Sequence, residues 1–453
     1  MSSDSLFEPS LSSERMREVV SDASWVQAML EVEAALARVE ARVGLIPEAA
    51  AMAIERHCNV GEYDIARIGR EAAESANPVV PLLRALREKL GGDAAAYVHR
   101  GATSQDIVDT AMMLIAGRAI GLMLDDLGKA SACAASLAER HRSTVMPART
   151  LLQQASVTSF GLKAAGWLVA IMEARDSLIN TRDSVLAVQL GGAVGTLSAF
   201  REHGPEIQAR LAQELGLVRP LLPWHSDRRR VAQLASAIAI SAGAAGKLAL
   251  DIVLLAQTEV GEVREGRVSG RGGSSTLPQK QNPVGAIEIL AAVRGVNAQA
   301  ALLLGSMVQE QERAVGAWQA EWPALSGLLR LAGGAIWRMA IVLDSLEVDA
   351  GRMRHNLELT GGLIMSEAVT TLLAERTDPI TARNLVEAAV TESAEDKLPF
   401  KEVLANDAAI AKYLSAGDLA KALDPSNYLG SSSQLIDNAL AEYRRRGIGR
   451  DTQ

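Results

Sequence analysis

The sequence contains few cysteines and few aromatic residues. Of its 453 residues only two are cysteine, Cys58 and Cys133, and aromatic residues make up 3%. Two cysteines are too few for a disulfide framework and too far apart for a zinc-knuckle pattern, so we expect a protein of the reducing cytoplasm. A hydrophobic content of 48% with so few aromatic rings favours closely packed helices over a β-sandwich, and the sequence therefore predicts an all-α fold.

Several classes of partner are also disfavoured by what the sequence lacks. The 46 basic and 54 acidic residues give a net charge of −8, and no basic run is longer than Arg228 to Arg230, which argues against nucleic acid. Residues 1–9 contain acidic side chains and no apolar stretch of signal length, and no charge-free apolar run reaches the length of a membrane span. The dinucleotide-binding glycine pattern, the phosphate loop and the His-Glu-x-x-His motif do not occur, so we expect neither a cofactor nor a metal.

Apolar residues recur at helical spacing over most of the chain. This pattern predicts helical segments at 22–56, 79–91, 107–141, 149–185, 229–262 and 284–312, and shorter helices after Gly361-Gly362. Alanines crowd the segment 229–262, which could therefore approach its neighbours closely, as the centre of a helix bundle requires. We expect an N-terminal helical domain at 1–106, a central long-helix bundle at 107–360 and a C-terminal helical domain at 361–453.

The stretch from Gly273 to Pro283 interrupts this helical pattern. It reads Gly-Ser-Ser-Thr-Leu-Pro-Gln-Lys-Gln-Asn-Pro, and its two prolines together with the glycines that precede it predict a loop. Hydroxyls, an ammonium group and side-chain amides lie close together in this stretch of sequence, so the loop could clamp a carboxylate. An ordinary connection between two helices is the alternative interpretation.

This loop resembles the signature Gly-Ser-Ser-x-Met-Pro-x-Lys-x-Asn-Pro of the fumarase/aspartase superfamily and departs from it only at Leu277. The resemblance implies an all-α homotetramer whose long helices form a common bundle, with active sites shared between subunits and a small polycarboxylate as substrate. It also implies Ser274 as the general base, with Lys280 and Asn282 holding the substrate. A serine hydroxyl can serve as a base only if nearby donors stabilise its alkoxide.

The segment from His99 to Thr110 is polar where its neighbours are apolar. By its pattern alone, Ser104 or Asp106 could simply cap a helix that begins here. The segment resembles the His-x-Gly-x-Thr-Ser-x-Asp form of the superfamily's first conserved region. That resemblance implies contacts with the substrate from Thr103, Ser104 and His99.

Two later segments add candidates whose alternatives stay open. In Pro223 to Arg228, a histidine beside a tryptophan is often only a packed histidine. The Trp-His-x-x-Arg string nevertheless resembles the site motif of the carboxymuconate cycloisomerase branch, which implies His225 and Arg228 as secondary ligands. Glu312-Arg313 could be an exposed ion pair that contributes little, whereas the resemblance implies that Arg313 contacts substrate anions.

The segment Arg149 to Gln153 resembles the superfamily's second conserved region and implies that Gln153 contacts the substrate. It departs from that region at Leu151, where the superfamily has the histidine that protonates a leaving group. The glutamate that orients this histidine stands seven residues after the signature lysine, and here that position is Ile287. Both members of the acid pair are therefore apolar, which indicates a reaction that needs no acid there.

An ionised carboxylate meets that condition as nucleophile or leaving group, because its pKa of about 4 keeps it stable without a proton. The branch of the superfamily that uses such chemistry closes 3-carboxy-cis,cis-muconate to a γ-lactone through an enolate, in the catabolism of aromatic compounds. We expect that reaction, with Lys280 and Arg313 holding carboxylates and with Ser274 or Lys280 delivering the proton. An adenylosuccinate-type lyase that releases fumarate and a non-catalytic helical scaffold are the alternatives.

Overall fold

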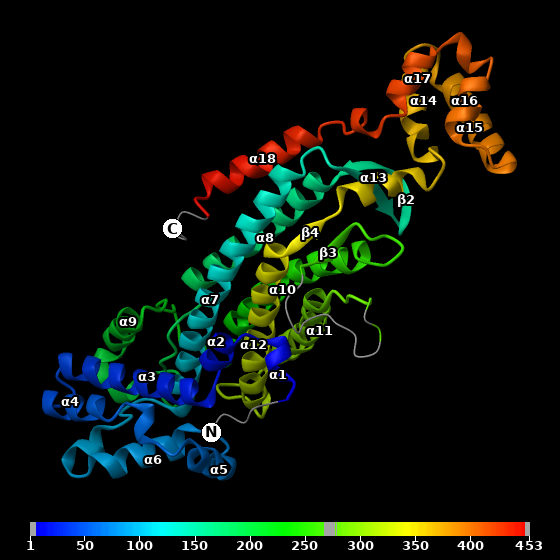
Figure 1. Cartoon of the computed structure of the whole chain (residues 1–453). Coiled ribbons are helices and arrows are strands. Elements are labelled where there is room, and N and C mark those ends of the chain that lie inside the picture. The colour runs from blue at the N-terminus through cyan, green and yellow to red at the C-terminus, as the bar shows by residue number, and fades with distance from the viewer. Residues whose placement is uncertain (1–5, 267–276, 278, 449–453) are drawn as a thin grey trace. The chain divides into compact units, whose positions relative to one another are not determined.

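Helices make up most of the protein (Figure 1). The computed structural model describes residues 6–266, 277 and 279–448, and it is 70% helical. The α-helices are α1 (Glu8–Leu11), α2 (Glu14–Val19), α3 (Asp22–Arg42), α4 (Glu48–Arg56), α5 (Ile65–Ser75), α6 (Val79–Leu90), α7 (Ser104–Arg140), α8 (Phe160–Ser184), α9 (Gly204–Leu215), α10 (Arg229–Leu255), α11 (Val284–Gly305), α12 (Ala317–Asp344), α13 (Ala350–Glu358), α14 (Ser366–Ala374), α15 (Pro379–Asp396), α16 (Phe400–Asn406), α17 (Ala416–Ala422) and α18 (Ser432–Arg445). The strands β1 (Val145–Thr150) and β2 (Gln153–Ser159) pair antiparallel, as do β3 (Val263–Glu265) and β4 (Leu346–Val348). The predicted all-α fold class is confirmed.

Five long helices, α7, α8, α10, α11 and α12, contain between 22 and 37 residues each. The unbroken helix predicted at 107–141 is α7, and Asp106 in its first turn accepts a hydrogen bond from Thr103 N at 3.0 Å, which caps the helix. Small residues bring neighbouring helices together. A Cβ on Gly295 of α11 would lie only 2.7 Å from a methyl carbon of Leu331 of α12, so a larger residue at this position would displace that side chain.

The helix predicted from residue 149 to about 185 begins only at α8, and this prediction was wrong over its first part. Residues 145–159 form the β1–β2 hairpin instead, in which Thr150 pairs with Gln153. The run Ser156 to Ser159 contains β-branched residues and no helical apolar repeat, a composition that favours a strand. The consequence is that Leu151 and Leu152 lie at the tip of a tight turn.

Among the described residues, four helices are long and apolar enough to cross a membrane by length and composition: α7, α10, α11 and α12. In the most apolar 18-residue stretch of each helix, 67% of α7 and 72% of α12 is buried inside the protein. These two helices are therefore apolar because they form the core. The corresponding shares for α10 and α11 are 50% and 28%. The latter two helices therefore keep apolar side chains on the surface of the single chain.

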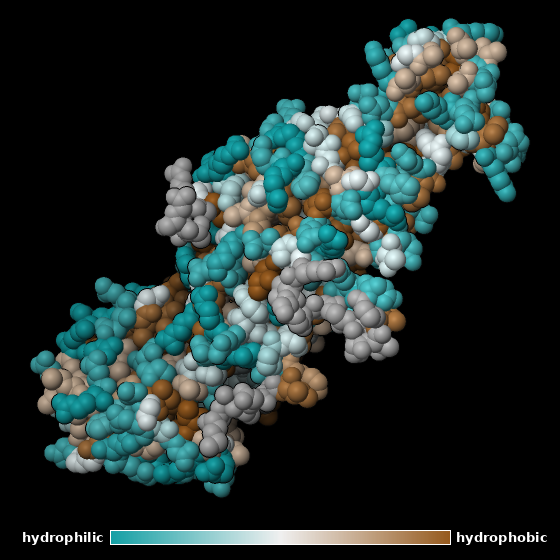
Figure 2. All heavy atoms as spheres, in the orientation of Figure 1, coloured by the Kyte–Doolittle hydropathy of each residue, from teal (hydrophilic) through white to brown (hydrophobic). Residues whose placement is uncertain are grey.

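The chain divides into two compact units with separate hydrophobic clusters. Unit 1 comprises Met1–Leu127, Glu173–Lys247 and Glu288–Met339, and unit 2 comprises Gly128–Met172, Leu248–Ile287 and Ala340–Gln453. In unit 1, side chains of α3 and α9 pack around Phe200, and in unit 2, side chains of α14 to α17 pack around Phe400. On the face drawn in Figure 2, hydrophobic residues show as groups between hydrophilic ones. The division into three domains stays a prediction.

Candidate active site

The carboxylate of Asp106 joins three segments of unit 1 that are distant in sequence. Asp106 is buried at the start of α7, and its Oδ1 accepts from Gly191 N at 2.9 Å and lies 2.6 Å from His225 Nε2. Its Oδ2 accepts from Gly192 N at 2.9 Å and from Thr103 N at 3.0 Å. Because the carboxylate accepts from all these neighbours, His225 Nε2 is the donor in its pair. Asp106 therefore orients the predicted ligand His225 and holds the turn at Gly191 and Gly192, which we call the glycine turn, against α7.

Arg313 lies beside the same glycine turn, and neutral groups hold its guanidinium. Nη1 donates to Gln105 Oε1 at 2.8 Å, and Nη2 donates to Gly192 O and Ala193 O, also at 2.8 Å. Burial lowers the pKa of Arg313 from its ordinary value, although the nearby Asp106 carboxylate acts in the opposite direction. In the part of the chain that the structure describes, Arg313 forms no direct ion pair. Its positive charge therefore remains available to an anion.

Arg228, the other predicted arginine ligand, is 1% exposed and is paired with two carboxylates. Its Nη1 and Nη2 donate to the two oxygens of Asp109 at 2.7 and 3.0 Å, and its Nε donates to Glu321 Oε1 at 3.0 Å. Its guanidinium also lies 4.9 Å from the ring centroid of Trp224. Burial alone would lower the pKa of Arg228, but the two carboxylates outweigh burial and raise it. This geometry favours a positioning role for Arg228 over the predicted contact with substrate.

His99 is also paired with a carboxylate. Its Nδ1 lies 2.6 Å from Oε1 of Glu33, which is on α3. Burial alone would lower the pKa of His99, but Glu33 outweighs burial and raises it, which favours the imidazolium form. Farther along α3, burial raises the pKa of Glu40 to about 8. The hydroxyls of the predicted ligands Thr103 and Ser104 are half-buried and make no hydrogen bond within the described residues, so both can donate to a ligand.

In unit 2, the β1–β2 hairpin is anchored close to its turn and carries two apolar side chains at its tip. Arg149 donates to both oxygens of the buried Glu262, at 3.0 and 2.7 Å, and Asn356 Nδ2 donates to the same carboxylate at 2.7 Å. Leu151 and Leu152 have φ angles of 51° and 66° and are 97% and 72% exposed. A two-residue turn with both φ values positive favours Asn-Gly, and two leucines are strained there. Backbone strain and exposed apolar surface therefore occur together at Leu151, the position where the superfamily has its histidine, and at its neighbour Leu152.

The described part of the signature loop also belongs to unit 2. Residues 279 and 281–283 line a cavity of about 430 Å³, and this set includes the predicted ligand Asn282. The predicted ligands Lys280 and Gln153 are exposed. Ser274, the predicted base, lies outside the described residues.

The structure thus assigns the predicted site residues to both units. Thr103, His225 and Arg313 are brought together around Asp106 in unit 1, whereas Gln153, Lys280 and Asn282 belong to unit 2. Among the described residues, no group of three or more His, Cys, Asp or Glu side chains could hold a metal ion.

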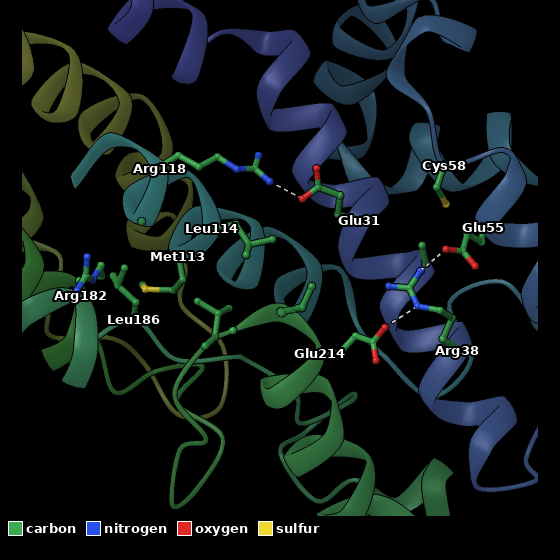
Figure 3. A pocket seen from close by; sticks show the side chains of 15 residues that line it. Glu31, Arg38, Glu55, Cys58, Met113, Leu114, Arg118, Arg182, Leu186 and Glu214 are labelled. Carbon is green, nitrogen blue, oxygen red and sulfur yellow. Dashed lines mark hydrogen bonds and ion pairs between the residues drawn. The ribbon is translucent and has the colours of Figure 1, made fainter. Parts of the chain in front are cut away.

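A larger cavity, of about 690 Å³, is lined by other side chains of unit 1 (Figure 3). Its charged groups face one another: Arg38 pairs with Glu55 and with Glu214, both at 2.7 Å, and Arg118 pairs with Glu31. Cations and anions that already neutralise one another in this way have little capacity left for a charged substrate. The superfamily motifs contribute no residue to its lining. We therefore place the active site elsewhere.

Comparison with known proteins identifies the family. A family model described as "Lyase" matches residues 8–300, and one described as "Adenylosuccinate lyase C-terminus" matches residues 362–439. The chain belongs to this lyase family.

Individual members of this family have different activities. The 3-carboxy-cis,cis-muconate cycloisomerase of Bradyrhizobium diazoefficiens is 45% identical over 443 residues, which cover 97% of this chain and 98% of the relative. The nitrosuccinate lyase of Streptomyces davaonensis is also 45% identical, over 432 residues that cover 93% of this chain and 91% of the relative. The crystal structure of the 3-carboxy-cis,cis-muconate lactonizing enzyme from Pseudomonas putida matches with a TM-score of 0.92 at 38% identity, covering 97% of this chain and 99% of that one. The predicted fumarase/aspartase-like fold is confirmed.

Four residues that hold predicted ligands or their neighbouring segments in place were not predicted from the sequence. They are Gln105, Asp109, Glu262 and Glu321, all of them buried. A signal existed for Asp109, because its spacing of three residues from Asp106 places both carboxylates on one face of α7. Glu321 offered only the weaker signal of a single acid in a largely apolar stretch, and Glu262 stands among other charged residues with no signal of its own.

Proposed function

We propose that the protein is a cycloisomerase that closes 3-carboxy-cis,cis-muconate to its γ-lactone, 4-carboxymuconolactone. The observation that carries the proposal is the apolar character of the two positions that form the acid pair in the superfamily. Leu151 is at the exposed hairpin tip, and Ile287 is an exposed residue of α11. Without an acid there, the site suits a carboxylate that reacts in its ionised form. The 45% identity to a relative named as a muconate cycloisomerase supports the same reaction.

In this reaction one carboxylate oxygen of the substrate forms a bond to an alkene carbon. The displaced π electrons move onto the conjugated carboxylate as an enolate, and a proton is then added at carbon. Negative charge accumulates on that carboxylate in the transition state, where a fixed cation stabilises it most. Arg313 suits this role because its own partners are neutral. We assign Lys280 as the second cation and either Ser274 or Lys280 as the proton donor.

We assign the remaining contacts to neutral donors and to histidines. The half-buried hydroxyls of the first conserved region can donate to a substrate carboxylate, and the amides can do the same. These proposed ligands are Thr103, Ser104, Gln153, Asn282, His99 and His225. The last of them is presented by Asp106 in a fixed orientation.

Elimination of nitrite from a nitro-dicarboxylate is a second candidate, because a nitrosuccinate lyase is 45% identical to this chain. Nitrite leaves as the anion of an acid that is ionised at neutral pH, so the apolar Leu151 and Ile287 suit it as well as they suit a carboxylate. An adenylosuccinate-type elimination must protonate an amine as it leaves, which these two side chains cannot do. A non-catalytic scaffold is disfavoured by the retention of Lys280 and Asn282.

We further propose a cytoplasmic homotetramer with shared active sites and with no membrane or nucleic-acid partner. The support is the apolar surface that single-chain folding leaves uncovered on α10 and α11. Exposed side chains on these two helices include Ile240, Leu250, Ile287, Leu302 and Leu304. Burying such surface between copies is strongly favourable in water. Sedimentation should show a tetramer, and mixing inactive Ser274→Ala subunits with inactive Arg313→Ala subunits should restore part of the activity.

One assay tests the proposed reaction against its rivals. The purified chain, treated with a chelator, should convert 3-carboxy-cis,cis-muconate to the lactone, seen as loss of the absorbance of the conjugated diene. Nitrosuccinate and adenylosuccinate are tested in parallel for release of nitrite and of fumarate. Faster turnover of either of these substrates would replace the proposal by the corresponding elimination.

A further inference from the structure

Two arginines near the glycine turn are held in opposite ways. Arg228 donates to the carboxylates of Asp109 and Glu321, so its charge is neutralised inside the protein. Arg313 donates instead to one side-chain amide and two backbone carbonyls. An amide oxygen can orient a guanidinium through a hydrogen bond without cancelling its charge, whereas a carboxylate does both.

The amide that holds Arg313 is that of Gln105, and its orientation is fixed from the other side. Gln105 is 2% exposed, and its Nε2 donates to His225 O at 2.7 Å and to Asp109 Oδ2 at 3.1 Å. Because both of these partners are acceptors, the NH₂ group must face them and Oε1 must face Arg313. The Nη1 of Arg313 lies 2.8 Å from that oxygen. Gln105 therefore connects Asp109, which neutralises Arg228, to Arg313, which keeps its charge.

We propose that Gln105 is a positioning residue that holds Arg313 in place while leaving its charge available for a carboxylate of the substrate. The inference rests on the proposed function in one respect, namely that Arg313 binds a substrate carboxylate. A glutamate at position 105 would have nearly the same shape, but it would form an ion pair with Arg313 and compete with the substrate. The identity of this one side chain thus determines whether the site binds an anion.

The test is the binding of tricarballylate, an unreactive tricarboxylate, to the full-length protein by isothermal titration calorimetry. Burial and the facing carboxylate of Asp109 should raise the pKa of the introduced glutamate, whereas Arg313 favours its ionised form, so binding is measured from about pH 5 to about pH 9. At the upper end of this range Gln105→Glu should bind the probe roughly 10-fold to 100-fold more weakly than the unchanged protein. Toward about pH 5 the deficit should shrink, because the introduced carboxyl, once protonated, can donate to Asp109, one of the two acceptors of the amide, and accept from Arg313 without adding a charge. Comparing the two proteins at each pH removes the effect of the probe's own protonation.

Two further variants separate this role from general damage to the fold. Gln105→Met removes the acceptor without adding a charge, so its deficit should be independent of pH. Gln27→Glu is the matched control, since Gln27 also donates to a carbonyl, Cys58 O at 3.3 Å, and accepts from a backbone group, Val60 N at 2.9 Å. Within the described residues Gln27 makes no hydrogen bond to an arginine, and this control should bind tricarballylate as the unchanged protein does.

The inference is overturned if Gln105→Glu binds as tightly as the unchanged protein at the higher pH, or if its deficit is the same at both pH values. Failure of the unchanged protein to bind tricarballylate would overturn it too. Lactonisation by the unchanged protein is measured in parallel. Binding with the expected pH dependence but without lactonisation would refute the proposed reaction and leave the role of Gln105 intact.

Discussion

Replacing Arg228 by methionine tests whether this arginine maintains the structure or binds substrate. Methionine keeps much of the length of the side chain but removes the cation between Asp109 and Glu321, and all three side chains are fully buried. Removing one partner of a buried ion pair leaves an uncompensated charge, which costs about 3–5 kcal/mol. For 453 residues the unfolding entropy is about 1 kcal/mol per kelvin, so the unfolding midpoint should fall by roughly 3–5 °C.

The loss of stability should also depend on pH. Burial already raises the pKa of Glu321, and Arg228 opposes that shift. Without Arg228 the pKa of Glu321 should rise further in the folded protein. A carboxyl whose pKa is higher in the folded state contributes stability below its unfolded pKa, and that stability is lost as the pH rises through the folded pKa. The variant should therefore be closest to the unchanged protein at about pH 5 and farthest from it at about pH 8.

Scanning calorimetry at both pH values measures this effect. Arg229→Met is the control, because Arg229 is an exposed neighbour whose partner Asp227 is exposed as well, and its midpoint should not change. An unchanged midpoint for Arg228→Met would refute the reasoning. If that variant kept its stability but bound tricarballylate more weakly, Arg228 would be a substrate ligand, as predicted from the sequence.

Three other predictions concern single sites. Leu151→His should fail to raise the initial rate of lactonisation, because an acid has nothing to protonate when a carboxylate reacts. We expect the rate to fall, and acceleration would restore the lyase alternative. Replacing the turn by Leu151→Asn with Leu152→Gly should raise the free energy of unfolding by about 1–2 kcal/mol in denaturant titrations, because it relieves two strained φ angles. The same double variant should lose activity, and full activity would show that the tip does not act in the site. Glu40→Gln should be more stable than the unchanged protein above pH 8, since a folded-state pKa of about 8 against an ordinary 4.5 means that the unchanged protein loses stability as the pH rises between these values. Equal stability of the two proteins in alkaline solution would contradict the burial of an ionisable carboxyl at Glu40.

The fold class and the long helices could be predicted from the sequence because their signals are local. The helix α7 has a helical apolar repeat, no proline and a capping side chain at its start, and all of these are visible along the chain. The β1–β2 hairpin was missed because its turn is Leu151-Leu152, which lacks the glycine or asparagine that usually indicates a hairpin turn. Pairing between the two strands and tertiary contacts such as that of Arg149 with Glu262 maintain the turn, and both are properties of the folded chain.

The functional motifs were visible in the sequence, but the roles of individual residues within them were not. Arg228 and Arg313 each stood in a motif and each was predicted to bind substrate. In the folded protein, Arg228 is neutralised by carboxylates 119 and 93 residues away in the chain, whereas Arg313 is held by an amide 208 residues away. The charge that an arginine can offer to a ligand depends on which groups folding places around it, because a carboxylate neutralises a guanidinium within a few ångströms and an amide does not. Residue type and motif spacing were therefore sufficient to predict the family and its chemistry, while the tertiary contacts decided which arginine remains free to bind an anion.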